Sequence, residues 1–429
     1  MMTEVCLRHQ SVAGIHQLAV YESVGGYATW RALLAGKIKP EYILQELKRS
    51  QLRGRGGAGF LTSMKWQFMN RGTPGDKFLI CNSDEGEPGT FKDTLIMKHN
   101  PHQLIEGIAI CSYVIGASRA YNYIRGEYLQ EYHQVERALY EAKEAGLLGA
   151  NILGSGFNLC IENLLGAGSY IVGEETAMME SIEGKRAMPR NKPPFPAVSG
   201  LYGCPTTINN TETLASVPMI VSKGGDWFKS LGVENSGGTK IFCVSGHVVN
   251  PGTFELPMGV PMQNLIDLCG GVRHNRRIKA VIPGGTSMRV IPGHTIPEVT
   301  MDYDGLARVN SAVGSGGMIV MDETTSMPMA LMHMMHFYHQ ESCGQCTPCR
   351  EGSGWISQAL KQLVKGDGSV ALVDEIYQVA SSIEGRTICA FGEAITWPVT
   401  SFIDHFREEF DRTAELGVKG RPGFEWSIT

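Results

Sequence analysis

Long apolar runs, basic blocks and targeting segments are all missing from this sequence. It contains no stretch of 18 consecutive apolar residues, so it predicts no membrane-spanning helix. Lys and Arg number 38 against 43 Asp and Glu, without a Lys/Arg block, so charge favours no nucleic-acid partner. Residues 1–10 have neither the apolar core of a secretory signal nor an Arg-rich transit pattern. We therefore expect a cytoplasmic chain without direct membrane contact.

Charged residues are also scarce, at 19% of the chain, whereas the apolar fraction of 43% is ordinary for a globular protein. This balance excludes an intrinsically disordered chain. The 429 residues are enough for about three domains. Glycine is abundant instead, with 52 residues in aperiodic clusters. Clustered glycine indicates tight turns or close approaches of the backbone.

Strand and helix patterns alternate over the first half of the chain and predict a layered α/β domain. Near residue 240 the pattern changes to a strand, a hairpin, a short helix and another strand, which indicates a small separate domain. From residue 328 onward the signal is helical. We expect four parts: an α/β domain with an N-terminal helical segment over 1–238, a small β domain over 239–325, a helical bundle over 326–412, and a poorly ordered tail over 413–429.

Four cysteines near the C-terminus carry the strongest chemical signal. Cys343, Cys346 and Cys349 form a C-x2-C-x2-C run, and Cys389 is the only other cysteine in the helical region. Four thiolates hold a 4Fe–4S cluster, and this run is one of its recurring forms. Structural zinc and free thiols are the alternatives, although zinc sites favour two separated C-x2-C pairs. The odd total of eleven cysteines, without a secretion signal, argues against a disulfide framework.

A glycine loop at residues 54–59 satisfies the pattern G-x-G-x-x-G. Residues 45–50 before it are polar and helical, whereas a Rossmann turn requires a preceding buried strand. The loop is therefore either a flexible surface loop or an anion-binding loop of another kind, because bare backbone N–H groups can approach a phosphate closely. In the second case Arg55 and Lys65 would supply positive charge.

Two acidic turns and three aromatic residues complete the candidates. Asp84, Glu85 and Glu87 follow a predicted strand at the position where α/β folds place ligands. Glu174 and Glu175 follow a second glycine-rich turn. Solvated turns are the simpler interpretation of both. The aromatic residues near the candidate loops could stack a base, or they could be ordinary core residues; they are Phe60, Phe68 and Phe195.

Taken together, these motifs closely resemble the flavoprotein subunit of bacterial NADH:quinone oxidoreductase, respiratory complex I. The matching stretches run in order between about residues 40 and 410. Two departures, Val172 in place of a frequent Cys and Thr211 in place of Val, carry no necessary chemistry. The stretches are 54–60, 82–90, 166–213 and 341–351, followed by Cys389.

The resemblance implies a Rossmann-like FMN-binding α/β domain, a ubiquitin-like β-grasp domain and a C-terminal helical bundle carrying a 4Fe–4S cluster. It implies that the chain oxidises NADH by hydride transfer to FMN and passes electrons singly through the cluster to other subunits, towards quinone. The partners implied are a small 2Fe–2S thioredoxin-like subunit and a large multi-cluster subunit, at the cytoplasmic face of the inner membrane.

Two other functions stay open at this stage. A diaphorase subunit of an NAD-linked hydrogenase or formate dehydrogenase often carries ferredoxin-like extensions, for which we expect no room here. A zinc-binding scaffold with a degenerate nucleotide pocket is the third hypothesis.

The resemblance also assigns roles to residues. Glu87 and Glu175 would orient the ribose and carboxamide of the dinucleotide, and Lys65 would offset negative charge near the reduced flavin. Phe60, Phe68 and Phe195 would stack on the dinucleotide. The residues implied for binding FMN and NAD(H) are Gly54, Arg55, Gly56, Gly57, Ala58, Gly59, Phe60, Lys65, Phe68, Asn82, Asp84, Glu85, Glu87, Tyr170, Gly173, Glu174, Glu175, Phe195, Ile208, Asn209, Asn210 and Thr211.

Overall fold

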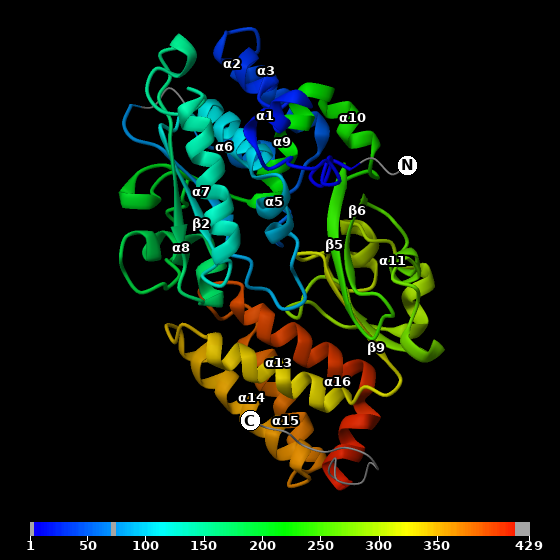
Figure 1. The fold of residues 1–429 in the computed structure, drawn as a ribbon. Coiled ribbons are helices and arrows are strands. Elements are labelled where there is room, and N and C mark those ends of the chain that lie inside the picture. Colours follow the sequence, from blue (N-terminus) through cyan, green and yellow to red (C-terminus); the bar gives the residue numbers. More distant parts are fainter. Residues whose placement is uncertain (1–3, 70–73, 417–429) are drawn as a thin grey trace.

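The computed structural model describes residues 4–69 and 74–416. Two β-sheets and a helical bundle organise this part of the chain. In Figure 1 the bundle lies below both sheets, with the N-terminal half of the chain above it.

The first sheet is parallel throughout and has the strand order β3-β2-β1-β4. Alternate residues of β1 enter different cores: Leu79 and Cys81 join the cluster under the larger helices, and Phe78 and Ile80 join a smaller cluster on the opposite face. Both faces are therefore covered, as parallel sheets require. The strands are β1 (Phe78–Ser83), β2 (Arg119–Ile124), β3 (Cys160–Leu165) and β4 (Thr206–Asn210).

Helices connect and cover these strands. Two of them, α6 and α9, pack so closely that a Cβ on Gly107 would lie 2.1 Å from the carbonyl oxygen of Leu214. The helices are α5 (Asp93–His99), α6 (Pro101–Ile115), α7 (Leu129–Glu144), α8 (Glu175–Ile182), α9 (Thr211–Lys223) and α10 (Gly225–Ser230).

Four short helices precede the first strand. The buried carboxylate of Glu106 in α6 accepts hydrogen bonds from the Tyr21 hydroxyl at 2.6 Å and from the Tyr27 amide at 3.0 Å, which docks the first two of them. The glycine loop lies between the other two, so the prediction that a helix rather than a buried strand precedes it is confirmed. They are α1 (Leu18–Ser23), α2 (Ala28–Leu34), α3 (Pro40–Ser50) and α4 (Thr62–Gln67).

The second sheet is mixed, with the order β6-β5-β9-β7-β8. A β5–β6 hairpin is followed by α11, and β9 then inserts parallel to β5 and antiparallel to β7. The expected β-β-α-β order is present. The elements are β5 (Thr239–Gly246), β6 (Gly252–Pro257), α11 (Met262–Leu268), β7 (Ile278–Ile282), β8 (Ile291–Pro292), α12 (Tyr303–Arg308) and β9 (Gly317–Asp322).

The C-terminal bundle has its own apolar core, which includes Tyr338, Ile356 and Phe402. Its last helix continues past residue 413, where we expected the tail to begin. Residues 417–429 of that tail lie outside the described residues, and the four expected domain boundaries stay predictions. The helices are α13 (Met327–Glu341), α14 (Thr347–Lys365), α15 (Val370–Ile383) and α16 (Phe391–Leu416).

Within the described ranges 4–69 and 74–416, none of the helices combines the length and apolar character needed to traverse a bilayer.

The α6–α9 contact leads to a stability prediction. We expect Gly107→Ala to lower the free energy of unfolding by roughly 1–3 kcal/mol, because the added methyl group overpacks against backbone. Gly146→Ala is the control: it has a φ of +67° but open space around it, so only backbone strain of about 1 kcal/mol is expected. Thermal and urea unfolding measure both. An equal or smaller loss in Gly107→Ala would contradict the packing argument.

Candidate functional site

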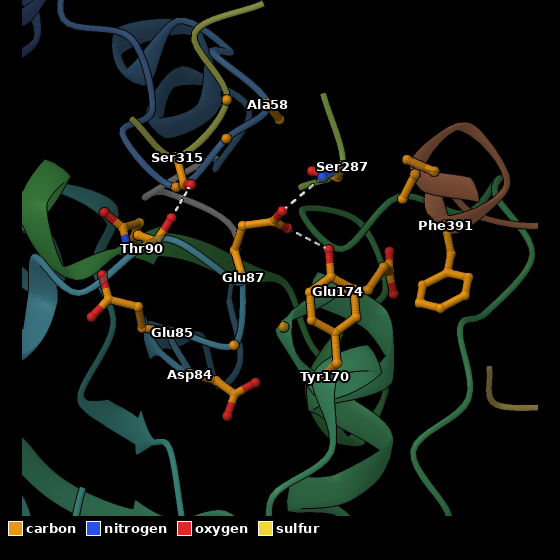
Figure 2. A pocket seen from close by; sticks show the side chains of 18 of the residues that line it. Ala58, Asp84, Glu85, Glu87, Thr90, Tyr170, Glu174, Ser287, Ser315 and Phe391 are labelled. Carbon is orange, nitrogen blue, oxygen red and sulfur yellow. Dashed lines mark hydrogen bonds between the residues drawn. The ribbon is translucent and has the colours of Figure 1, made fainter. Parts of the chain in front are cut away.

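A cavity of about 480 Å³ lies where the carboxyl ends of β1 and β4 meet the second sheet and the start of α16. Figure 2 shows its wall, with Ala58, the acidic turn, Tyr170, Ser287 and Phe391 around one space. Its size is in the range of small-molecule and cofactor sites. The predicted residues that line it are Gly56, Gly57, Ala58, Asn82, Asp84, Glu85, Glu87, Tyr170, Gly173, Glu174, Asn210 and Cys389.

Other predicted residues do not line this cavity: Gly54, Arg55, Gly59, Phe60, Lys65, Phe68, Glu175, Phe195, Ile208, Asn209 and Thr211. Sequence reasoning in turn missed several residues that do. Lys92 and Asp93 stand just beyond the acidic turn and could have been found by extending that motif. Most of the others come from loops of the second sheet and from α16, where no local pattern marks them; they include Ser287, Met288, Gly314, Ser315, Phe391 and Trp397.

The glycine loop forms one wall of the cavity. Gly54 N–H donates to the Phe60 carbonyl at 2.8 Å and closes the loop. A Cβ on Gly56 would lie 3.0 Å from Cβ of Asn210, and Gly57 has a φ of +134°. A Cβ on Gly56 would therefore crowd the end of β4, and the bare backbone leaves space beside the loop for a ligand.

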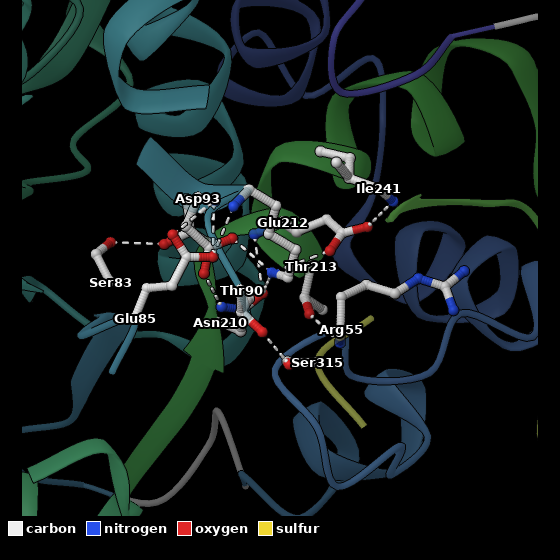
Figure 3. Close-up of polar contacts among 12 residues, drawn as sticks. Arg55, Ser83, Glu85, Thr90, Asp93, Asn210, Glu212, Thr213, Ile241 and Ser315 are labelled. Carbon is white, nitrogen blue, oxygen red and sulfur yellow. Dashed lines mark hydrogen bonds and ion pairs between the residues drawn. The ribbon is translucent and has the colours of Figure 1, made fainter. Parts of the chain in front are cut away.

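The side chain of Arg55 points away from the cavity, as Figure 3 shows. It is 1% exposed, its Nη2 donates to the Gly237 carbonyl at 2.7 Å, and its Nε and Nη1 have no protein partner. We expected this guanidinium to place positive charge at the loop, and the structure does not show that contact. The Arg55 amide instead donates to Thr213 Oγ1 at 2.8 Å and anchors the loop to α9.

The acidic turn is held inside the protein, so its interpretation as a solvated turn is wrong. Glu85 accepts hydrogen bonds from the amides of Lys92 and Asp93 at 2.9 and 3.0 Å. Burial, reinforced by the charge of Asp93, raises the pKa of Glu85 to about 7. Glu87 accepts from the Tyr170 hydroxyl at 2.6 Å and from the Ser287 amide at 2.9 Å, as Figure 2 shows, and burial raises its pKa.

Asp84 differs from its neighbours because its Oδ2 is buried without a hydrogen-bond partner. Burial raises the pKa of this carboxyl to about 7. A buried polar atom on a cavity wall costs free energy unless something bonds to it. Asp84 therefore fits a ligand that donates a hydrogen bond.

The second acidic pair has two separate roles. Glu174 caps α8 by accepting from the amides of Thr176 and Ala177 at 2.8 and 2.9 Å. Glu175 lies 3.0 Å from Lys65 Nζ and 2.8 Å from Lys192 Nζ. Burial opposes its ionisation, but the two ammonium groups prevail and lower the pKa of Glu175 to about 2. The fold thus brings Lys65 and Glu175 together, two of the three residues predicted to take part in the reaction.

The three candidate aromatic residues are exposed, so they are not core residues. Phe60, Phe68 and Phe195 have exposed fractions of 47%, 57% and 58%. Phe60 precedes α4 and Phe68 follows it in the chain, and the centroids of their rings lie 6.2 Å apart. Large apolar rings in solvent next to a glycine loop fit a surface that stacks on a planar ligand.

The four predicted cysteine ligands converge at one end of the bundle. Cys343, Cys346 and Cys349 lie at the junction of α13 and α14, and Cys389 comes just before α16. Burial raises the thiol pKa of Cys349 to about 11 and that of Cys389 to about 12, and neighbouring cysteines add to both shifts. Four soft thiol donors gathered in this way fit an iron–sulfur cluster. In ranges 4–69 and 74–416, no three or more His, Cys, Asp and Glu side chains are arranged around a single-ion position.

Three family models match successive segments of the chain. The Nuo51 FMN-binding domain matches residues 47–219, the SLBB domain matches residues 241–291, and the NADH-ubiquinone oxidoreductase-F iron-sulfur binding region matches residues 329–413. The first match contains the glycine loop and both acidic turns, and the last contains all four cysteines. The zinc alternatives are therefore wrong.

Similar proteins extend over nearly the whole chain. An NADH-quinone oxidoreductase F subunit of Rhizobium meliloti is 49% identical over 411 residues, 96% of this chain and 97% of the relative. The corresponding F subunit of Rickettsia bellii is 49% identical over 92% of this chain and 95% of the relative. Among solved structures, an NAD⁺-reducing [NiFe]-hydrogenase in the H₂-reduced state is 33% identical with a TM-score of 0.84, over 93% of this chain and 67% of that chain.

Asp84 leads to a pH-dependent prediction for the protein freed of flavin. A carboxyl whose pKa rises from 3.8 to about 7 on folding favours the folded state while protonated, and that contribution is lost as the pH rises through about 7. Asp84→Asn should therefore match wild type near pH 4 and exceed its free energy of unfolding by roughly 1–3 kcal/mol at pH 8. Urea unfolding at both pH values measures this, and an equal gain at both would refute it.

Proposed function

This chain belongs to the family of NADH-quinone oxidoreductase F subunits, and from that premise we propose which of its residues serve each step of the reaction. As a complex I subunit of this kind, it oxidises NADH through FMN and transfers electrons to a 4Fe–4S cluster. The diaphorase alternative has less support, since the hydrogenase similarity is 33% identical against 49% for the complex I relatives.

One observation carries the assignment of the flavin site: a single cavity is lined both by the predicted flavin residues and by Cys389. NADH gives up a hydride and a 4Fe–4S cluster takes one electron at a time, so the bound flavin supplies the exchange between two-electron and one-electron chemistry. We place FMN in this cavity. The chain's contribution is to hold a flavin beside a cluster ligand, with Phe391 in the same cavity wall.

The glycine loop and Asp84 are the groups best suited to contact FMN directly. The loop offers backbone unhindered by Cβ atoms, and Asp84 offers an acceptor without a protein partner. Asn82 and Asn210 donate to protein acceptors instead: Asn82 Nδ2 to the Gly173 carbonyl at 2.9 Å, and Asn210 Nδ2 to Asp93 Oδ2 at 2.6 Å. These two residues shape the cavity, and any contact they make with FMN uses their remaining atoms.

We assign dinucleotide binding to the surface around Lys65 and the exposed aromatic residues. Phe60, Phe68 and Phe195 would stack on the rings of NADH, and Glu175, kept ionised by its two lysines, would face the ribose side. Glu87 has the same proposed role, but its carboxylate is already bonded to Tyr170 and Ser287. A contact between Glu87 and the ribose therefore requires one of these bonds to be exchanged.

The partners proposed for this complex I subunit are the small 2Fe–2S thioredoxin-like subunit and the large multi-cluster subunit. Cys343, Cys346 and Cys389 are only partly buried, which leaves a short route from the cluster to the protein surface. An electron acceptor at that surface fits the proposal. Through the complex, the chain would sit at the cytoplasmic face of the inner membrane.

The first functional prediction separates hydride transfer from electron transfer to the cluster. In Cys389→Ser, carrying FMN, NADH should bleach the flavin absorbance at a rate within about threefold of wild type, because no thiolate takes part in that step. The EPR signal of the reduced cluster should be lost or strongly weakened, because one of four ligands is gone. Stopped-flow absorbance and low-temperature EPR measure the two steps. Cys204→Ser, outside the cluster, is the control and should preserve both signals.

Two outcomes would contradict this assignment. An unchanged cluster signal in Cys389→Ser would mean that another residue is the fourth ligand. A flavin that stays bound but is no longer reduced by NADH would mean that the two steps are not independent.

The second prediction concerns the choice between NADH and NADPH. Glu175→Gln should raise the kcat/KM of NADPH relative to NADH about tenfold, roughly 1.4 kcal/mol, because a carboxylate that repels the 2′-phosphate is removed and two lysines remain. Glu183→Gln is the matched control. Burial opposes the ionisation of Glu183 too, and Lys185 and Arg190 overcome it, so that its pKa is also about 2, but this residue pairs with neither Lys65 nor Lys192 and is not among those proposed to bind the dinucleotide. If Glu175→Gln keeps the wild-type ratio of the two kcat/KM values, as the control should, Glu175 does not contact the ribose side of the dinucleotide.

A further inference from the structure

A chain of buried charges lies directly behind the flavin cavity. Lys92, Asp93, Glu212 and Lys240 are each 1–2% exposed. Lys92 Nζ lies 2.6 Å from Asp93 Oδ1 and 3.0 Å from Glu212 Oε2, and the same Glu212 oxygen lies 3.2 Å from Lys240 Nζ. Figure 3 shows Asp93 and Glu212 among these contacts.

The two ends of this chain differ in their access to the cavity. Lys92 and Asp93 belong to its lining, whereas Glu212 and Lys240 do not. Glu212 bridges the two sheets, because its Oε1 accepts from the Ile241 amide at 2.8 Å in β5 while its Oε2 contacts Lys92 beside the first sheet. The charge of Lys240 is therefore connected to the cavity wall without touching what binds there.

Lys240 also supports the loops around the cavity. Its ammonium donates to the Arg55 carbonyl at 3.2 Å, within the glycine loop. Its side chain runs so close to Gly316 that a Cβ there would lie 2.6 Å from Cε of Lys240. Gly314 and Ser315, just before it, line the cavity. Lys240 thus contacts both the glycine loop and the segment next to Gly314 and Ser315, which form two walls of the cavity.

The buried cluster gathers three basic side chains around three carboxyls. Lys92, Lys240 and Arg55 face Asp93 and Glu212, and the third carboxyl, Glu85, has a pKa raised to about 7 by its burial. Burial lowers the pKa of Lys240 to about 8, with Lys92 and Arg55 adding to this effect and Glu212 opposing it. Lys92 faces two carboxylates, and although burial opposes it, they raise its pKa.

We propose that Lys240 is a positioning residue of the flavin site: acting through Glu212 and Lys92, it keeps positive charge behind the cavity and raises the reduction potential of the flavin bound there. This inference rests on the proposed placement of FMN. A hydride transferred from nicotinamide C4 carries two electrons and one proton, so the acceptor gains one negative charge while the nicotinamide gains one positive charge. Positive charge fixed nearby favours the reduced acceptor over the oxidised one.

The test compares charge changes of opposite sign in the full-length chain carrying FMN. Lys240→Met should weaken binding of reduced relative to oxidised FMN about tenfold, which lowers the midpoint potential by about 30 mV for a two-electron couple. Glu212→Gln removes a negative charge instead and should raise the potential. The midpoint potential of the double variant should be close to that of wild type, because the two changes remove one positive and one negative charge together. Spectroelectrochemical titration measures the potentials, and the dissociation constants of oxidised and reduced FMN give the same ratio independently.

Controls separate this role from a merely structural one. Loss of packing would weaken both forms of FMN alike and leave the potential unchanged. Glu106→Gln removes another fully buried, hydrogen-bonded carboxylate, in α6 and outside the cavity lining, and should not shift the potential. If either single variant fails to fold, the other decides alone, since each sign is predicted separately.

The decisive quantity is the ratio of the dissociation constants of reduced and oxidised FMN. The proposal is overturned if folded, flavin-loaded Lys240→Met and Glu212→Gln both leave this ratio within threefold of wild type, or shift it in the same direction. A wild-type chain that binds no FMN would contradict the proposed flavin site itself, which is a different result.

Discussion

The parallel pairing of β1 with β4 is the constraint on which the site depends. Asn82 pairs with Asn210 in register, so two segments 128 residues apart in the chain leave the sheet at the same edge. The acidic turn follows one strand and α9 follows the other. The glycine loop then packs on Asn210 so closely that a Cβ on Gly56 would lie 3.0 Å from Cβ of Asn210, tighter than most Cβ contacts. A shift in this register would separate the acidic turn, the start of α9 and the glycine loop.

Burial alone does not decide the charge state of the carboxylates around the cavity. Asp84 and Glu85 have pKa values of about 7, whereas Glu175, also largely buried, has a pKa of about 2. The difference lies in the neighbouring cations. Glu175 lies between two lysines, whereas Glu85 shares Lys92 with Asp93. For Asp84, Arg125 is the cation that lowers the pKa, and burial outweighs it. Carboxyl side chains therefore serve two purposes here. Glu175 stays ionised, whereas the protonation of Asp84 and Glu85 can respond to a ligand that binds beside them.

The cavity belongs to no single part of the chain. Glu87, in the turn after β1, bonds to Ser287, in the loop between β7 and β8. Thr90 bonds to Ser315, and Cys389 with Phe391 brings in the helical bundle. Each of these contacts brings a different unit into the cavity wall. Relative movement of the units would change the cavity, which is a physical reason for the buried ion pairs and hydrogen bonds that join them.

The sequence by itself determined the local features of this protein. Strand and helix periodicity predicted the layered α/β region and the helical bundle, and the spacing of Cys343, Cys346 and Cys349 predicted the cluster ligands, because such patterns arise within short segments. It also indicated the glycine loop and the acidic turns. It could not distinguish a solvated turn from a buried one, nor show that Arg55 points away from the cavity. Only the tertiary structure decided that Ser287, Ser315 and Phe391 complete the cavity and that Lys240 lies behind it, because contacts between residues a hundred or more positions apart depend on sheet register and packing, which no local pattern encodes.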